Sequence, residues 1–169
     1  MKRLSYLGIA AVMVVTLSAA NPKSAVADGP ADMTVSDVLS LDPDDPDVKG
    51  VSALIRTDEG VAMKLLTTDL APGAYTVWWV VFNPGVEGFS AGFAASHVVG
   101  PSGTATFAAN LRQGEALSLF GSLLDAREAE IHLAVRYHGP VVPTLLYDQL
   151  HTFEPATAVN VQFSVHEAP

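Results

Sequence analysis

The sequence predicts an all-β fold: an antiparallel β-sandwich of Greek-key, immunoglobulin-like type with seven or eight strands. Short runs of β-branched and aromatic residues recur along the chain, and Gly- or Pro-containing turns separate them. Residues 74–82 form the strongest run. They are apolar on both faces, which indicates a central strand covered on both sides. Residues 144–150 show a weak helical pattern.

The expected strands follow one another through short connections. In chain order they are 51–56, 61–66, 74–82, 95–99, 104–111, 116–119, 129–139 and 159–166. The turn signals at 57–60 and 100–103 predict that the strands on either side of each turn pair as a hairpin. The last strand alternates apolar and polar residues, so we expect Asn160, Gln162, Ser164 and His166 on its solvent-facing side.

The chain divides into a leader, an acidic segment and one β-domain. Residues 1–27 combine a basic start, an apolar run and small residues before Asp28, which is typical of a signal peptide. We therefore expect a secreted or periplasmic protein with no stable membrane insertion after signal cleavage. Residues 28–50 are an acidic N-terminal segment, expected to be partly disordered, and residues 51–169 are the β-sandwich domain.

Charge and composition exclude several kinds of chemistry. The 169 residues carry a net charge of −9, and the expected signal peptide contains three of the nine basic residues and none of the 18 acidic ones. Such an acidic surface repels phosphate backbones, so we expect no nucleic-acid partner. Cysteine is absent, which excludes thiol catalysis and disulfides.

The strand at 129–139 carries the best candidate site. Side chains alternate across a strand, so one of its faces is apolar and the other gathers Glu130, His132, Arg136 and His138. We take His132, Arg136 and His138 as candidate ligand-binding residues, because a planar guanidinium suits carboxylates. The alternative is a structural ionic network in which Arg136 pairs with a carboxylate from a neighbouring strand.

Metal binding is possible only at one end of this strand. His132 and His138 lie six residues apart, which is about 20 Å in a straight strand, and one ion cannot bind both. His138 precedes the turn at Gly139, after which the chain returns to His151. His138, His151 and Asp148 are therefore candidate ligands for Zn²⁺ or Cu²⁺.

Other functional patterns are weaker. Residues 42–47 place four aspartates around two prolines, which fits a loop that binds Ca²⁺ or a solvated acidic linker. Their spacing does not match an EF-hand. The sequence contains no nucleophile elbow, phosphate-binding Gly loop or zinc-protease motif, so an enzyme based on His132, Arg136 and His138 ranks below a binding module.

Two segments carry a family resemblance. They are Tyr75–Asn83, which reads YTVWWVVFN, and residues 129–139, which contain AEIHL and RYHG. The chain resembles a family of uncharacterised exported bacterial β-sandwich proteins, and is distantly similar to chordin-type (CHRD) domains. The resemblance covers about 51–166 and implies export and a β-sandwich, but no activity. Members often carry cysteines after the aromatic strand, and this chain departs from that pattern.

Together these features predict an exported cell-envelope or extracellular protein that acts as a non-enzymatic binding or structural module. Its partner would be a small ligand or an envelope protein. The alternative is an envelope protein that binds Zn²⁺ or Cu²⁺ through His138 and His151.

Overall fold

The structure is a computed structural model that describes residues 30–154 and 158–169. The expected signal peptide at 1–27 lies outside the described residues. The strands are β1 (Asp32–Ser40), β2 (Val48–Thr57), β3 (Gly60–Thr67), β4 (Gly73–Phe82), β5 (Ser90–Val99), β6 (Ala105–Arg112), β7 (Glu130–Tyr137) and β8 (Val159–His166). A 3₁₀ turn (Pro143–Leu145) leads into α1 (Leu146–His151), where the sequence shows its weak helical pattern.

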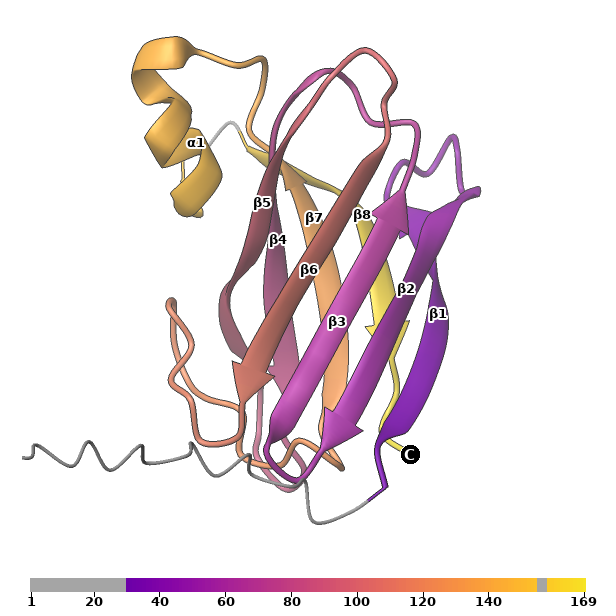
Figure 1. Cartoon of the computed structure of the whole chain (residues 1–169), viewed down its shortest axis with the longest axis vertical. Helices are drawn as coiled ribbons and strands as arrows, with labels where there is room; N and C mark the ends of the chain where they lie inside the picture. Colours follow the sequence, from indigo (N-terminus) through magenta and orange to yellow (C-terminus); the bar gives the residue numbers. More distant parts are fainter. Residues whose placement is uncertain (1–29, 155–157) are drawn as a thin grey trace, which may run out of the picture.

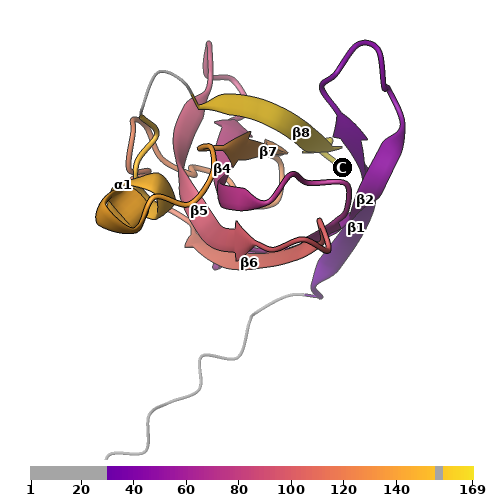
Figure 2. The same ribbon diagram turned by 90° about the horizontal axis from the view of Figure 1, so that it is seen from above.

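All eight strands belong to one antiparallel sheet in the order β5-β4-β7-β8-β1-β2-β3-β6. The sheet curls until its end strands, β5 and β6, approach each other, which makes a nearly closed barrel (Figures 1 and 2). The all-β, antiparallel, eight-stranded prediction is confirmed. The division into two sheets of a Greek-key sandwich is not confirmed, because hydrogen-bonded neighbours continue from β5 to β6 without a break.

Pairing differs from the prediction at one hairpin. β2 and β3 pair around the turn at 57–60 as expected. β5 pairs with β4, and β6 pairs with β3, so the turn at 100–103 joins the two ends of the sheet instead of a hydrogen-bonded hairpin. A turn signal marks where the chain reverses, but the closure of the barrel decides which strand edges pair.

The sheet also begins earlier than expected. Strand β1 lies within 28–50, the segment expected to be an acidic lead-in, and pairs with β2 from Asp32 opposite Arg56 to Leu39 opposite Val48. β1 pairs with β8 only at Leu39 and Ser40. The described domain therefore includes β1, and β1 and β8 separate beyond this short ladder.

The barrel interior is apolar on one side and polar on the other. Strand β4 is buried on both faces, as predicted, with Trp79 inside the barrel and Trp78 outside beneath α1. On β8, Asn160 is exposed as predicted, but the prediction is wrong for Gln162, Ser164 and His166, which are buried. Their polar groups find partners inside the barrel, so burial costs them little.

Helix α1 packs outside the barrel against β4 and β5 (Figure 2). In Figure 1, by contrast, no helix crosses in front of β1, β2, β3 and β6. Within 30–154 and 158–169, no helix is long and apolar enough to cross a bilayer.

Candidate functional site: a pocket beneath α1

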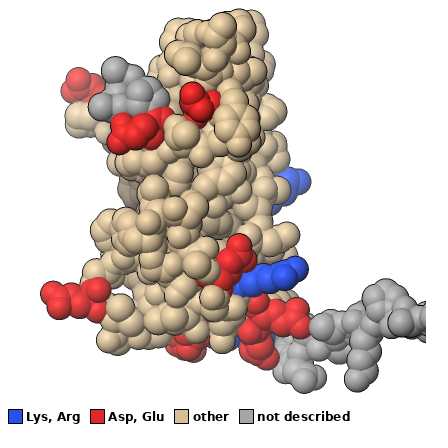
Figure 3. Space-filling view, turned by 90° about the vertical axis from the view of Figure 1, so that its left-hand side faces the viewer, with Lys and Arg blue, Asp and Glu red and all other residues tan. Residues whose placement is uncertain are grey.

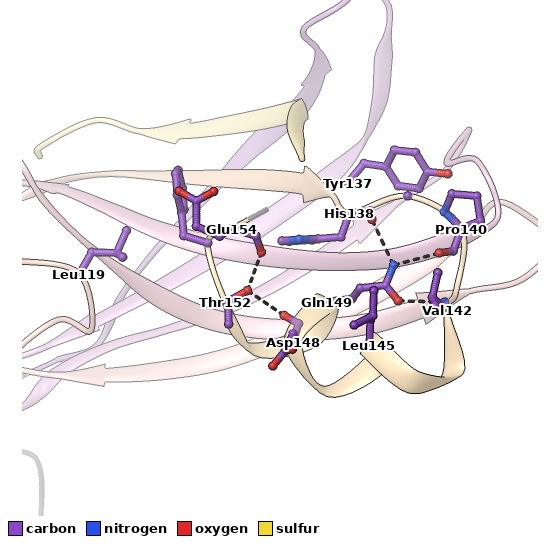
Figure 4. A pocket seen from close by; sticks show the side chains of 12 residues that line it. Leu119, Tyr137, His138, Pro140, Val142, Leu145, Asp148, Gln149, Thr152 and Glu154 are labelled. Atoms are coloured by element: carbon purple, nitrogen blue, oxygen red, sulfur yellow. Dashed lines mark hydrogen bonds between the residues drawn. The ribbon is translucent and has the colours of Figure 1, made fainter. Parts of the chain in front are cut away.

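A pocket of about 970 Å³ lies between the end of β7 and the segment that carries α1 (Figure 4). Its apolar lining comes mainly from Leu119, Tyr137, Pro140, Val142, Leu145 and Phe153. The polar side chains in the lining belong to His138, Asp148, Gln149, Thr152 and Glu154. A concave, largely apolar site with a few polar groups is the usual form of a small-molecule site.

Gln149 holds the segment over the strand. Its side chain is buried, and its Nε2 donates to the carbonyl oxygens of His138, at 3.1 Å, and Pro140, at 2.9 Å. Its Oε1 accepts from the backbone N–H of Val142 at 3.0 Å (Figure 4). Helix α1 has only six residues, too few to be stable alone, so these bonds fix its position.

His138 lies at the inner wall of the pocket and is only 5% exposed. Trp78 Nε1–H donates to Thr76 Oγ1 at 2.7 Å, and the same hydroxyl lies 2.7 Å from His138 Nε2. The Thr76 oxygen has two lone pairs, so it can accept from Trp78 and either donate to Nε2 or accept from it, according to the tautomer of His138. The other ring nitrogen, Nδ1, has no hydrogen-bond partner among the described residues.

The charge of His138 follows from its surroundings. Burial, and secondarily the positive charge of Arg136, lower the pKa of His138 below its usual value. The ring is therefore neutral at neutral pH. Its Nδ1 is a buried polar atom without a partner, which is costly in free energy.

Arg136 is close to His138 along the chain but does not line the pocket, because Phe153 covers its guanidinium. It is 9% exposed, its Nε donates to the Phe153 carbonyl oxygen at 3.0 Å, and its Nη1 donates to Asn160 Oδ1 at 3.1 Å. The guanidinium carbon lies 4.0 Å from the centre of the Phe153 ring. Arg136 therefore anchors the covering segment through the carbonyl and the ring of Phe153, and it also bonds to Asn160 of β8. It has no direct carboxylate partner in the described part of the chain.

His132 lies elsewhere. It is partly exposed, its Nε2 is hydrogen-bonded to Glu130 on the same strand, and its ring packs 4.9 Å from that of Phe82. It does not line the pocket. Of the three predicted ligand-binding residues, the structure thus places only His138 in the cavity wall.

The predicted metal ligands do not form a recognisable centre. His151 is exposed, its Nδ1 bonds to the Tyr147 carbonyl at 2.8 Å, and its ring stacks on that of Tyr147. Asp148 is exposed and lines the pocket. Among the described residues no three His, Asp or Glu side chains are grouped as metal ligands, so the His138, His151 and Asp148 site stays a prediction.

The expected Ca²⁺ loop connects β1 and β2. Lys49 forms an ion pair with Asp45 at 2.7 Å and with Asp69 at 3.3 Å, and Asp42 Oδ1 accepts from the backbone N–H of Asp44 at 3.0 Å. These carboxylates thus have partners within the protein, and Ca²⁺ binding stays a prediction.

A second polar cluster, missed in the sequence, lies inside the barrel. His166 Nε2 is 2.8 Å from Ser52 Oγ, and His166 Nδ1 is 2.8 Å from Thr34 Oγ1. Ser52 also bonds to Ser164. The Ser–His distance resembles that of a nucleophile and its base, but Ser52 is fully buried and none of the described pockets is lined by it, so no substrate can approach.

The charged side chains on the face that bears α1 are mostly acidic. In Figure 3 the acidic side chains gather towards the top and the bottom of this face, and a basic side chain projects at its right-hand edge at mid-height. No protein-family model, curated protein or solved structure matches this chain. The resemblance to exported β-sandwich proteins and chordin-type domains therefore stays a prediction.

Proposed function

We propose that this protein binds a small, uncharged and mostly apolar molecule in the pocket beneath α1. The observation that carries the proposal is the cavity itself: about 970 Å³, with a mainly apolar lining, beneath a segment pinned by Gln149. Such a volume is at the upper end of typical small-ligand sites. Burying an apolar ligand there would supply the driving force for binding.

The charges of the lining narrow the class of ligand. Asp148 and Glu154 are its only charged residues, and both are acidic. An anionic ligand is disfavoured there. This replaces the expectation of a carboxylate on Arg136, whose guanidinium is already engaged.

Two naphthalene dyes provide the test. N-phenylnaphthylamine is neutral, and anilinonaphthalene sulfonate is an anion with a similar ring system. Titrating the protein with both dyes therefore shows whether a negative charge on an otherwise similar ligand weakens binding. We expect fluorescence enhancement with the neutral dye, its reversal by decanol, and little response to the anion or to decanoate. Equal binding of both dyes, or of neither, would contradict the proposal.

Two variants locate the binding. Leu145 lines the pocket and Leu124 does not, yet each is 52% exposed, so both positions tolerate a charge equally well. Leu145→Glu should weaken binding of the neutral dye about tenfold, because a charged side chain replaces an apolar contact that the bound dye would cover. Leu124→Glu should leave it unchanged, and equal effects of the two changes would move the site elsewhere.

The proposal includes export, because residues 1–27 have the pattern of a signal peptide. We also propose that the nearly closed barrel is a variant of the expected Greek-key sandwich in which the sheet is continuous. Zn²⁺ or Cu²⁺ binding by His138 and His151 is the second candidate, supported by the unpartnered His138 Nδ1, which can bind a metal in the tautomer that carries the proton on Nε2. Saturating Zn²⁺ should then raise the Tm, and His151→Ala, at an exposed position, should abolish the rise; an unchanged Tm would reject this candidate.

A further inference from the structure

The outer face of β1, β2 and β3 is apolar and uncovered. Antiparallel register places Val35, Ala53 and Lys64 in one row across the three strands, and Asp37, Val51 and Leu66 in the next row. Met33 and Ile55 lie opposite each other in the row beyond. Within the described residues, nothing crosses this face in Figure 1.

The exposure of this face is unusual for a free surface. Met33 is 65% exposed, Val35 61%, and Val51, Ile55 and Leu66 between 40% and 43%. Contiguous apolar side chains on a sheet face mark an interaction surface more often than a solvated one. The barrel interior is filled from the opposite faces of these strands, so the outer apolar residues contribute nothing to the described core.

The two charges on the face indicate what covers it. Lys64 and Asp37 are both exposed, and neither takes part in an ion pair among the described residues. They lie two strands and one row apart, which is about 12 Å from the spacing of strands and residues. A twofold axis in the plane of contact, passing near Val51 and Ala53, brings Lys64 of each copy over Asp37 of the other.

We propose that this face binds a second copy of the chain, forming a twofold dimer in which two Lys64–Asp37 pairs border an apolar contact. A twofold interface uses the same patch on both partners, and this patch is complementary to itself in charge. The eight residues named on this face are fewer than the roughly 20–30 residues that each partner contributes to a standard interface. The dimer is therefore weak and concentration-dependent, and it leaves the pocket beneath α1 free.

Sedimentation velocity over a range of protein concentrations tests the dimer. Lys64→Glu makes the chain more acidic and Asp37→Lys makes it less acidic, so net charge alone would shift association in opposite directions. Both single changes should instead raise the dimer Kd about tenfold or more. The double variant, which exchanges the two charges, should return Kd to within about threefold of the original.

Each other outcome overturns the proposal. A wild-type chain that stays monomeric up to millimolar concentration has no such dimer. A dimer that the double variant does not restore uses another surface or another pairing. A monomer that binds phosphatidylcholine vesicles, and loses this binding on Ile55→Asp, would assign the face to a lipid surface instead.

Discussion

His166 makes the stability of the barrel depend on pH. It is 2% exposed, and burial, followed by the positive charge of Arg56, lowers its pKa from 6.5 to about 4. The unfolded chain therefore binds a proton at His166 between pH 6.5 and 4, whereas the folded chain does not. Stability is complete above pH 6.5 and falls as the pH drops towards 4.

The size of the effect follows from the two pKa values. Between pH 7.5 and pH 5, His166 alone should remove about 2 kcal/mol from the free energy of unfolding. For a domain of this size, that is a fall of about 1 M in the urea midpoint. The direct contacts of the ring are neutral hydroxyls, Ser52 and Thr34, and neither can compensate an imidazolium charge.

Urea unfolding at pH 7.5 and pH 5 tests the prediction with His166→Gln, which keeps a polar side chain but does not titrate. The variant should lose about 2 kcal/mol less than the wild type over this range, whatever its stability at pH 7.5. His97→Gln, at an exposed position, controls for the loss of an imidazole. Equal pH dependence of wild type and His166→Gln, or a His166 resonance that titrates near pH 6.5, would refute the reasoning.

Three further predictions concern stability alone, and urea unfolding at pH 7.5 measures each. Arg56→Met should cost about 3 kcal/mol, because the fully buried guanidinium donates to four backbone carbonyl oxygens at the base of the barrel; a cost below about 1 kcal/mol would contradict this. Gly50→Ala should cost at least about 2 kcal/mol, because the added Cβ meets the Leu66 carbonyl of the paired strand, whereas Gly100→Ala meets nothing and should be neutral. Arg127→Ala should cost no more than about 1 kcal/mol, since both of its aspartate partners are exposed; a larger loss would show that these surface pairs couple to the core.

Local patterns predicted most of the elements. The apolar run at 74–82 corresponds to β4, and the turn signal at 57–60 lies between paired strands. Local patterns were less informative about which strands pair, because β5 and β6 are joined by a turn and yet each hydrogen-bonds to another strand. Strand β1 was missed because its residues lie within an acidic segment that also contains prolines.

For the candidate site, too, local patterns predicted the strand faces but not the contacts between distant segments. Alternation along β7 correctly separated its core face from the face with His132, Arg136 and His138. It could not show that Phe153 covers Arg136, or that the α1 segment forms a pocket over His138. Those contacts join residues separated by a turn, a helix and a loop, and no spacing rule describes them.

The sequence by itself determined an all-β chain, the side chains that share each strand face, and the burial of both faces of β4. Only the tertiary structure decided which faces are enclosed. On β8 it buried Gln162, Ser164 and His166, and on β1 to β3 it left the apolar outer face open. The physical reason is that alternation specifies two faces of a strand, whereas the curling of the whole sheet and the position of α1 decide what covers each.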